Sequence, residues 1–121
     1  MTNEMKISNM LKDLGIPADL LGYRYLRYAI DLVMNDWSYV YGLTKKTYPS
    51  VAKKYFSTPT RVERAIRHAI ETAWTRGNQD TQEKLFGYTV DSFRGRPTSG
   101  EFIGTVADYL LHCEEESDGP K

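Results

Sequence analysis

The chain has 121 residues, of which 40% are hydrophobic, with nine tyrosines and two tryptophans. This length and composition predict one folded domain and exclude an intrinsically disordered protein. A formal net charge of zero excludes a uniformly basic nucleic-acid-binding protein, and a single cysteine, Cys113, excludes an internal disulfide.

Several classes of site have no support in the residue pattern. No segment resembles a signal peptide or reaches the roughly 20 apolar residues of a membrane span, so we expect a cytoplasmic protein without a membrane partner. The two histidines, His68 and His112, are far apart in sequence, so we expect neither a metal site nor a cofactor. An enzyme is not expected either, because no nucleophile with a base and no glycine-rich phosphate loop is present.

Two helices are predicted in the N-terminal third. Helical spacing of apolar residues predicts a first helix over residues 3–14, ended by Gly15. The longest periodic segment predicts a scaffold helix over residues 21–41, ended by Gly42. We interpret its tyrosines as packing residues in preference to a platform on which bases stack.

The middle of the chain has the layout of a helix-turn-helix at about residues 49–75. Residues 48–56 predict a short helix with Pro49 at its first position, where the missing N–H is tolerated. Ser57, Thr58 and Pro59 then interrupt the helical pattern. A longer helix follows over residues 60–74 or 60–75.

This longer helix has one apolar face and one polar face. Thr60 and Glu63 have the spacing of a capping box, which predicts that the helix begins there. The apolar residues fall at helical spacing along one stripe: Val62, Ala65, Ile66, Ala69, Ile70, Ala73 and Trp74. The polar face carries Arg61, Arg64, Arg67 and His68 in its first half. An amphipathic helix of this kind is also common in proteins that bind no DNA.

Charge is distributed unevenly along the chain. Residues 44–76 contain eight basic and two acidic side chains, a net charge of plus six, and the rest of the chain must therefore carry minus six. A basic patch on an acidic body can bind a phosphate backbone, although with less non-specific affinity than a uniformly basic domain.

The C-terminal third predicts two more helices and a tail. Arg76, Gly77 and Asn78 form a helix stop in which two residues tolerate positive φ. We expect a short helix over 81–86, an extended segment over 87–90 and a surface loop over 92–97. Thr98 and Glu101 form a second capping box, and the last helix runs to about His112. The folded domain thus spans residues 1–113, and the acidic segment 114–121 is expected to be disordered.

The motifs of the helix-turn-helix and of the segment after it resemble a known family. The chain is similar to the C-terminal effector domain of the sporulation master response regulator of endospore-forming bacteria, the stage zero sporulation protein A family. The resemblance covers about residues 7–111. It is carried by Tyr48-Pro-x-x-Ala52-Lys53-Lys54, by the run 61–71, and by Ala73-Trp74, Arg76-Gly77-Asn78 and Leu85-Phe-Gly-Tyr-Thr-Val90.

The resemblance implies an all-α single domain of about six helices that contains a helix-turn-helix and binds double-stranded promoter DNA. In the family, the positions that match Glu63, Arg64, Arg67 and His68 face DNA. The residue types agree, because arginine can bond guanine in bidentate fashion, glutamate can accept from cytosine, and histidine can reach a base edge or a phosphate. Arg61, Lys53 and Lys54 suit phosphate contacts that set the register.

The resemblance also implies protein partners. Residues 76–90 match the surface through which the family contacts the principal sigma subunit of RNA polymerase. Tandem copies of the family bind adjacent DNA sites, and we expect this chain to be a monomer in free solution.

Two departures from the family pattern affect the expected function. The family's regulators carry an N-terminal receiver domain, which this sequence does not contain, so direct control by phosphorylation is not expected. Pro17-Ala-Asp19-Leu-Leu21-Gly22 replaces the usual Pro-Ala-His-Ile-Lys-Gly. The change removes a histidine and a lysine that could contact phosphates and adds a negative charge, so we expect weaker DNA affinity than in the family. An alternative function is that of an interaction protein that antagonises or modulates the full-length sporulation regulator.

Overall fold

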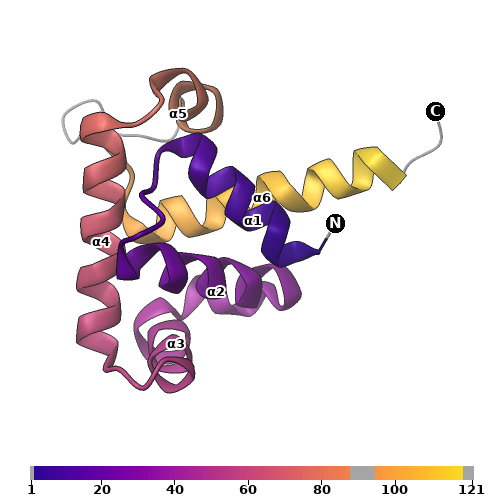
Figure 1. Cartoon of the computed structure of the whole chain (residues 1–121). Coiled ribbons are helices and arrows are strands. Elements are labelled where there is room, and N and C mark those ends of the chain that lie inside the picture. Colours follow the sequence, from indigo (N-terminus) through magenta and orange to yellow (C-terminus); the bar gives the residue numbers. More distant parts are fainter. Residues whose placement is uncertain (1, 88–94, 119–121) are drawn as a thin grey trace.

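The computed structural model describes residues 2–87 and 95–118, and these residues form helices and connections without any strand. Six α-helices surround a common core (Figure 1). They are α1 (Asn3–Leu14), α2 (Leu21–Asn35), α3 (Tyr48–Lys54), α4 (Pro59–Arg76), α5 (Gln79–Phe86) and α6 (Ser99–Asp118). A 3-10 helix, η1 (Trp37–Tyr41), and a π-helical turn, η2 (Leu43–Thr47), connect α2 to α3. The predicted all-α class is confirmed.

Helix α1 has the boundaries predicted from the sequence. The Thr2 hydroxyl accepts a hydrogen bond from the backbone N–H of Met5 and caps the N-terminus. Gly15 ends the helix with a φ of 94°, and its N–H donates to the carbonyls of Leu11 and Lys12. Glycine adopts this left-handed conformation without the steric cost that a β-carbon brings.

The second helix is shorter than predicted. A continuous helix over 21–41 is wrong, because α2 ends at Asn35 and the chain turns at Asp36 before η1. The Asp36 carboxylate accepts a hydrogen bond of 3.0 Å from the backbone N–H of Ser38 and caps the new turn. A hydrogen bond from the Ser38 side chain, then the Ser38 backbone bond and the charge of Lys46 at 3.8 Å, hold the pKa of Asp36 below its ordinary value. The apolar spacing continues across the break, so periodicity alone did not reveal it.

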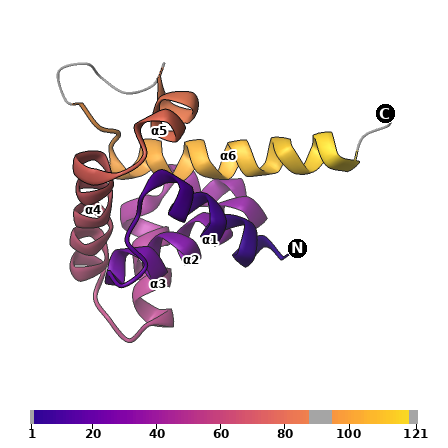
Figure 2. The same ribbon diagram turned by 45° about the horizontal axis from the view of Figure 1, so that its top comes forward.

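Helix α2 is the centre of the packing and lies against α1, α4 and α6 (Figures 1 and 2). Its residues Leu26, Ala29, Ile30 and Val33 are fully buried. Gly22 lies where α2 meets α4: a β-carbon at this position would be 2.2 Å from the Ala65 carbonyl oxygen. The two helices are therefore closer at Gly22 than any larger residue would permit.

The end of α4 is tied to α1 and α5 through a buried amide. The Gln82 side chain, 6% exposed, donates to the carbonyl oxygens of Leu14 at 3.0 Å and Ala73 at 2.8 Å. These two carbonyls belong to the last turns of α1 and α4. The last carbonyl groups of a helix lack N–H partners within the helix, so a side chain can serve as their donor. One side chain therefore links the C-terminal ends of two helices.

The predicted helix stop is confirmed, because α4 ends at Arg76, but neither residue after it adopts the positive φ that it tolerates. Gly77 has a φ of −86° and Asn78 a φ of −79°. Glycine is required at position 77 for space, because a β-carbon there would lie 2.3 Å from the Ala73 carbonyl oxygen and 2.7 Å from the Leu14 carbonyl oxygen. Asn78 caps α5 by accepting from the N–H groups of Asp80 and Thr81.

Replacing Gln82 by leucine is expected to lower the free energy of unfolding by about 1–3 kcal/mol, because the new side chain has a similar size but leaves buried carbonyl oxygens with fewer donors. Denaturant unfolding followed by circular dichroism measures the change. Gln79→Leu on the exposed start of the same helix is the control, with an expected change within about 0.5 kcal/mol. Equal stability of the two variants would contradict the role assigned to the Gln82 amide.

An aromatic cluster joins α4, α5 and α6. The Phe86 and Phe102 rings stack with centroids 5.5 Å apart, and Trp74 meets both rings edge to face at 5.2 and 5.9 Å. Phe86 and Phe102 are almost fully buried. This cluster fixes α6 against the C-terminal half of α4.

Helix α6 begins as predicted and ends later than predicted. The Thr98 hydroxyl accepts from the Glu101 N–H at 3.1 Å, and the Glu101 carboxylate accepts from the Thr98 N–H at 2.9 Å, which confirms the capping box. The helix continues to Asp118 and extends beyond the other helices (Figure 2). The backbone of residues 114–118 is therefore helical where disorder was expected, whereas residues 119–121 lie outside the described part of the chain.

Two other expected segments lie partly outside the residues that the structure describes. Residues 88–90 of the expected extended segment over 87–90 and residues 92–94 of the expected loop over 92–97 lie outside that part of the chain. Gly95, Arg96 and Pro97 are described and are not helical. No helix in residues 2–87 and 95–118 combines the length and apolar character needed to cross a lipid bilayer.

Candidate nucleic-acid interface

Helices α3 and α4 and the four residues between them have the layout of a helix-turn-helix. Helix α4 begins one residue earlier than predicted, at Pro59, and the expected capping box of Thr60 and Glu63 is wrong. The Thr58 hydroxyl caps the helix by accepting from the Arg61 N–H at 3.2 Å. Proline at the first helical position makes the preceding residue the cap, and here that residue has a capping hydroxyl.

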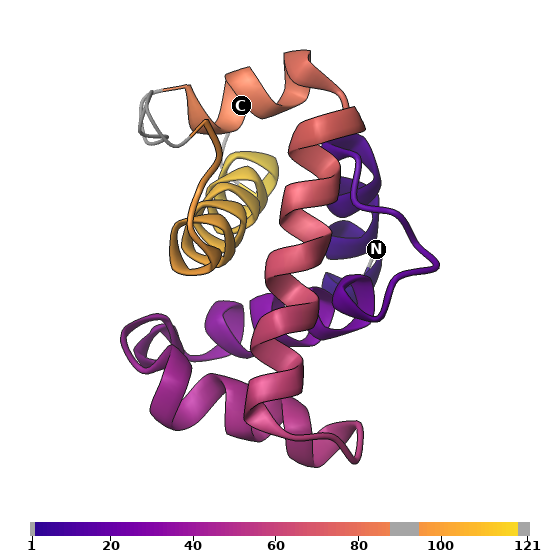
Figure 3. The same ribbon diagram turned by 90° about the vertical axis from the view of Figure 1, so that its left-hand side faces the viewer.

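The buried face of α4 is the predicted apolar stripe. Val62, Ile66, Ala69 and Ala73 are fully buried, and Ile70 is nearly so. Packing of this stripe on α2, α3 and α6 fixes the rotation of α4 about its axis. The polar face consequently points away from the body, and Figure 3 shows α4 in front of the other helices with its outer side uncovered by any described element.

All seven predicted DNA-contacting residues lie on the surface of this unit. Arg61, Arg64, Arg67 and His68 are exposed on α4, and Glu63 is half-buried on the same helix. Lys53 and Lys54 are exposed in the last turn of α3, directly before the turn that leads into α4. The structure thus brings the two predicted groups together on adjoining helices.

Arg64 is one of the cations on this surface that no internal contact holds among the described residues. It forms no ion pair or side-chain hydrogen bond with any residue in the described part of the chain. Arg61 and His68 likewise have no such partner among those residues. Lys54 lies 5.9 Å from the centroid of the Tyr28 ring, a weak contact for an exposed ammonium group. The Arg64 guanidinium group can therefore reach a ligand without first breaking a bond to another described residue.

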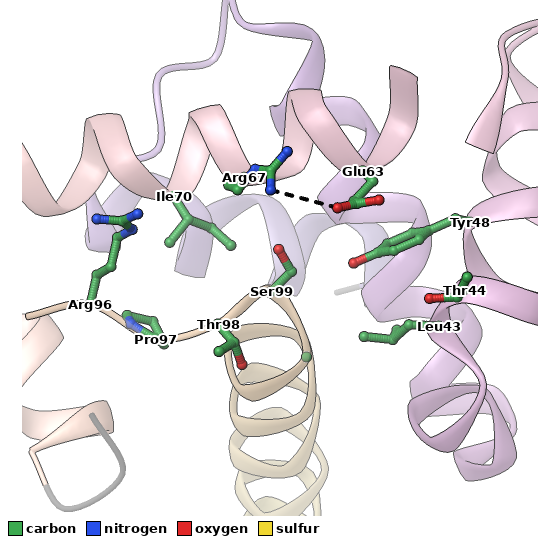
Figure 4. A pocket seen from close by; sticks show the side chains of 11 residues that line it. Leu43, Thr44, Tyr48, Glu63, Arg67, Ile70, Arg96, Pro97, Thr98 and Ser99 are labelled. Atoms are coloured by element: carbon green, nitrogen blue, oxygen red, sulfur yellow. Dashed lines mark ion pairs between the residues drawn. The ribbon is translucent and has the colours of Figure 1, made fainter. Parts of the chain in front are cut away.

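Arg67 and Glu63 form an ion pair one helical turn apart, with 3.7 Å between Arg67 Nη1 and Glu63 Oε1 (Figure 4). Both side chains are about half exposed, at 53% and 47%. Exposed pairs at this spacing contribute only about 0.3–0.5 kcal/mol. Because the ion pair is this weak, Arg67 and Glu63 can each leave it and bond to the edge of a base instead.

A cavity of about 430 Å³ separates the middle of α4 from the start of α6. Figure 4 shows Arg67 and Glu63 on its α4 side, Ser99 at the start of α6, and Tyr48 near Glu63 with its hydroxyl turned toward Ser99. Burial raises the pKa of Tyr48 above its ordinary value; Glu63 adds to the rise, while a hydrogen bond with Ser99 and the charge of Arg67 oppose it. The Tyr48 hydroxyl therefore stays protonated at neutral pH.

Arg96 anchors the chain next to this cavity. Its Nη2 lies 3.2 Å from Glu71 Oε1 on α4, so the segment that leads into α6 is tied to the middle of α4. The other arginine of the expected loop, Arg94, lies outside the described residues. Among the described residues no three histidine, cysteine, aspartate or glutamate side chains are grouped so that they would hold a metal ion.

The segment 76–87 presents polar side chains at one end of the molecule. Arg76, Asn78, Gln79, Asp80, Glu83 and Lys84 are exposed. Phe86 is buried in the aromatic cluster and Leu85 is half-buried against the core. Only the polar residues of this segment are therefore accessible to a partner, and residues 88–90 lie outside the described part of the chain.

One functional candidate was missed by reasoning from the sequence. Phe56, in the turn between α3 and α4, has a φ of 54° and an exposed fraction of 97%. The sequence placed Phe56 at the end of the expected helix over residues 48–56 and assigned no role to its ring. No sequence signal marked a left-handed conformation, because phenylalanine rarely adopts one.

A short helix, a four-residue turn and a second helix with an arginine-rich outer face have the arrangement of a helix-turn-helix, which many DNA-binding domains use. The family model described as "Sporulation initiation factor Spo0A C terminal" matches residues 7–110, and the chain belongs to this family. The family consists of DNA-binding effector domains of response regulators that control transcription in sporulation, and it is not an enzyme family.

Proposed function

We propose that this domain recognises specific promoter sequences by placing α4 in the major groove of DNA. Arg64 and Arg67 read bases, with guanine as the preferred partner of each guanidinium group. Glu63 and His68 add contacts at neighbouring base edges or phosphates, and Arg61, Lys53 and Lys54 hold the phosphate backbone. The observation that carries the proposal is the exposed position of Arg64 beside Arg67 on the outer face of α4, where its guanidinium group has no partner within residues 2–87 and 95–118.

The weak ion pair between Glu63 and Arg67 supports a reading role for both residues. It keeps the two side chains side by side in the free protein, at 3.7 Å. On DNA, the carboxylate can accept from a cytosine amino group while the guanidinium group bonds a guanine, so each charge exchanges one partner for another. The rearrangement costs little because both groups are already solvated.

The proposed partners other than DNA rest on exposed surface. The polar side chains of α5 and of the turn before it provide a surface that suits a contact with the sigma subunit of RNA polymerase. We place the domain in the cytoplasm, where bacterial promoters are found. It is proposed to be a monomer in free solution and to occupy adjacent DNA sites as tandem copies.

Selection of bound sequences from a random DNA pool at stated salt gives the site, and Arg64 variants then test the proposal. Arg64→Ala is expected to weaken binding to the selected duplex by about 1–3 kcal/mol and to change binding to random duplex little. Arg64→Lys is the matched control for charge, because lysine keeps the cation but lacks the bidentate fork. Fluorescence anisotropy measures the affinities.

The lysine variant should keep non-specific binding and still lose most of the specific affinity. A loss of the same size on selected and random duplexes would assign Arg64 to a phosphate contact. Failure of the wild-type chain to enrich any sequence would contradict specific reading altogether.

A further inference from the structure

The turn between α3 and α4 exposes an aromatic ring almost completely. Phe56 is 97% exposed, more than any other large hydrophobic side chain in the described part of the chain. A single exposed apolar residue needs no explanation by itself. The backbone at this position makes Phe56 different from the other exposed residues.

Phe56 occupies a backbone position at which phenylalanine is unfavourable. Its φ of 54° closes α3, and the next N–H, that of Ser57, donates to the Ala52 carbonyl at 2.9 Å. This bond is the outer bond of a Schellman motif, whose left-handed residue is usually glycine and sometimes asparagine. A β-carbon there costs free energy, and the exposed ring recovers none of it through packing. The Phe56 side chain therefore contributes nothing to the stability of the free domain.

The surroundings of Phe56 are cationic and free of carboxylates in sequence. From residue 37 to residue 62 the chain contains five basic residues and no aspartate or glutamate. Lys53 and Lys54 precede the ring and Arg61 follows it on α4, all exposed. Duplex DNA fits this combination, because it presents phosphates to the cations and apolar deoxyribose carbons and thymine methyl groups to the ring.

We propose that Phe56 is an additional DNA-contacting residue, whose ring packs on an apolar part of the duplex at the edge of the site read by α4. The apolar group is a thymine methyl or the carbon face of a deoxyribose. This inference rests on the proposed function of the helix-turn-helix. It accounts for a phenyl ring at a position where folding favours glycine.

Phe56→Ala and Phe56→Gly are expected to bind the duplex selected by the wild-type chain about tenfold more weakly, the loss expected when part of a phenyl ring no longer becomes buried. Thermal unfolding should show that Phe56→Gly is more stable than the wild type, because glycine adopts positive φ freely. Binding and stability then move in opposite directions, which a purely structural role does not produce. Tyr41→Ala, at another ring that is 83% exposed, is the matched control and should bind normally.

Replacing the thymines of the duplex by uracil, one at a time, removes a single methyl group in each duplex. This set of duplexes distinguishes a contact with a thymine methyl from a contact with a deoxyribose. If Phe56 contacts a methyl, the penalty of Phe56→Ala disappears on one uracil-containing duplex, whereas a deoxyribose contact leaves the penalty on all of them. Wild-type affinity of both Phe56 variants, together with weakened binding by Arg64→Ala, would overturn the inference and leave the proposed function intact. If Arg64→Ala also binds normally, the proposed function itself fails.

Discussion

Truncation of Phe102 to alanine is expected to lower the free energy of unfolding by about 3–5 kcal/mol, as for other fully buried phenylalanines. The ring is 0% exposed and stacks on Phe86 with 14° between the ring planes. Its removal leaves a cavity between three helices, because Trp74 and Phe86 also contact each other and cannot both move into the space. A domain of this size has only about 5–15 kcal/mol of stability in total, so the loss is a large part of it.

Urea unfolding followed by circular dichroism measures this loss, and the fluorescence of Trp74 in a Trp37→Phe background reports the cluster. Phe102→Leu is the control, since it keeps most of the apolar volume and should lose clearly less stability. An unfolding midpoint of Phe102→Ala equal to that of the wild type would mean that α6 is not held by the aromatic cluster.

The second large effect is expected at the crossing of α2 and α4. Gly22→Ala should destabilise the domain, at the upper end of the roughly 1–3 kcal/mol typical of overpacking. The added β-carbon would meet the Ala65 carbonyl oxygen at 2.2 Å and the Ala69 β-carbon at 2.6 Å. These atoms belong to or lie next to the backbone of α4, so relief requires movement of the whole helix. At a solvent-exposed position inside a helix, glycine to alanine would stabilise the protein by about 1 kcal/mol. The sign of the change in stability therefore shows whether α2 and α4 are in close contact at Gly22.

Gly104→Ala on α6 provides a matched control for Gly22→Ala. A β-carbon at Gly104 would have one near neighbour, a Val40 methyl at 3.2 Å, and that methyl can shift by side-chain motion. Thermal unfolding of the two variants should give a lower midpoint for Gly22→Ala and an unchanged or higher one for Gly104→Ala. A rise in both midpoints would show that α2 and α4 are not in close contact at Gly22.

Local sequence signals predicted the parts of the fold that have a local cause. Gly15, the pair Thr98 and Glu101, and the apolar stripe of α4 each act within a few residues, and each was predicted from its spacing. The start of α4 was predicted at the wrong threonine, although Pro59 pointed to Thr58. The break at Asp36 was missed because one carboxylate competes with the helix locally while the apolar period continues.

Features that depend on distant contacts had no sequence signal. Gln82 contacts the Leu14 carbonyl across 68 positions in sequence, and nothing around residue 82 predicted a buried amide. The candidate DNA-contacting residues were predicted because five of them lie on one amphipathic helix, Lys53 and Lys54 come shortly before it, and the segment matches a family motif. Phe56 was missed because its importance lies in a backbone conformation that its residue type disfavours.

The Gln82 amide has a consequence for whether α3 and α4 can fold apart from the rest of the domain. The carboxyl end of α4 is held by a side chain from α5 and shares that side chain with α1, so the motif is secured from outside its own sequence. A peptide limited to residues 48–76 lacks this clamp and the surface of α2, and short isolated helices are marginal in water. Residues 48–76 are consequently not expected to fold alone. A protein into which they are grafted would have to replace both the Gln82 hydrogen bonds and the packing surface of α2.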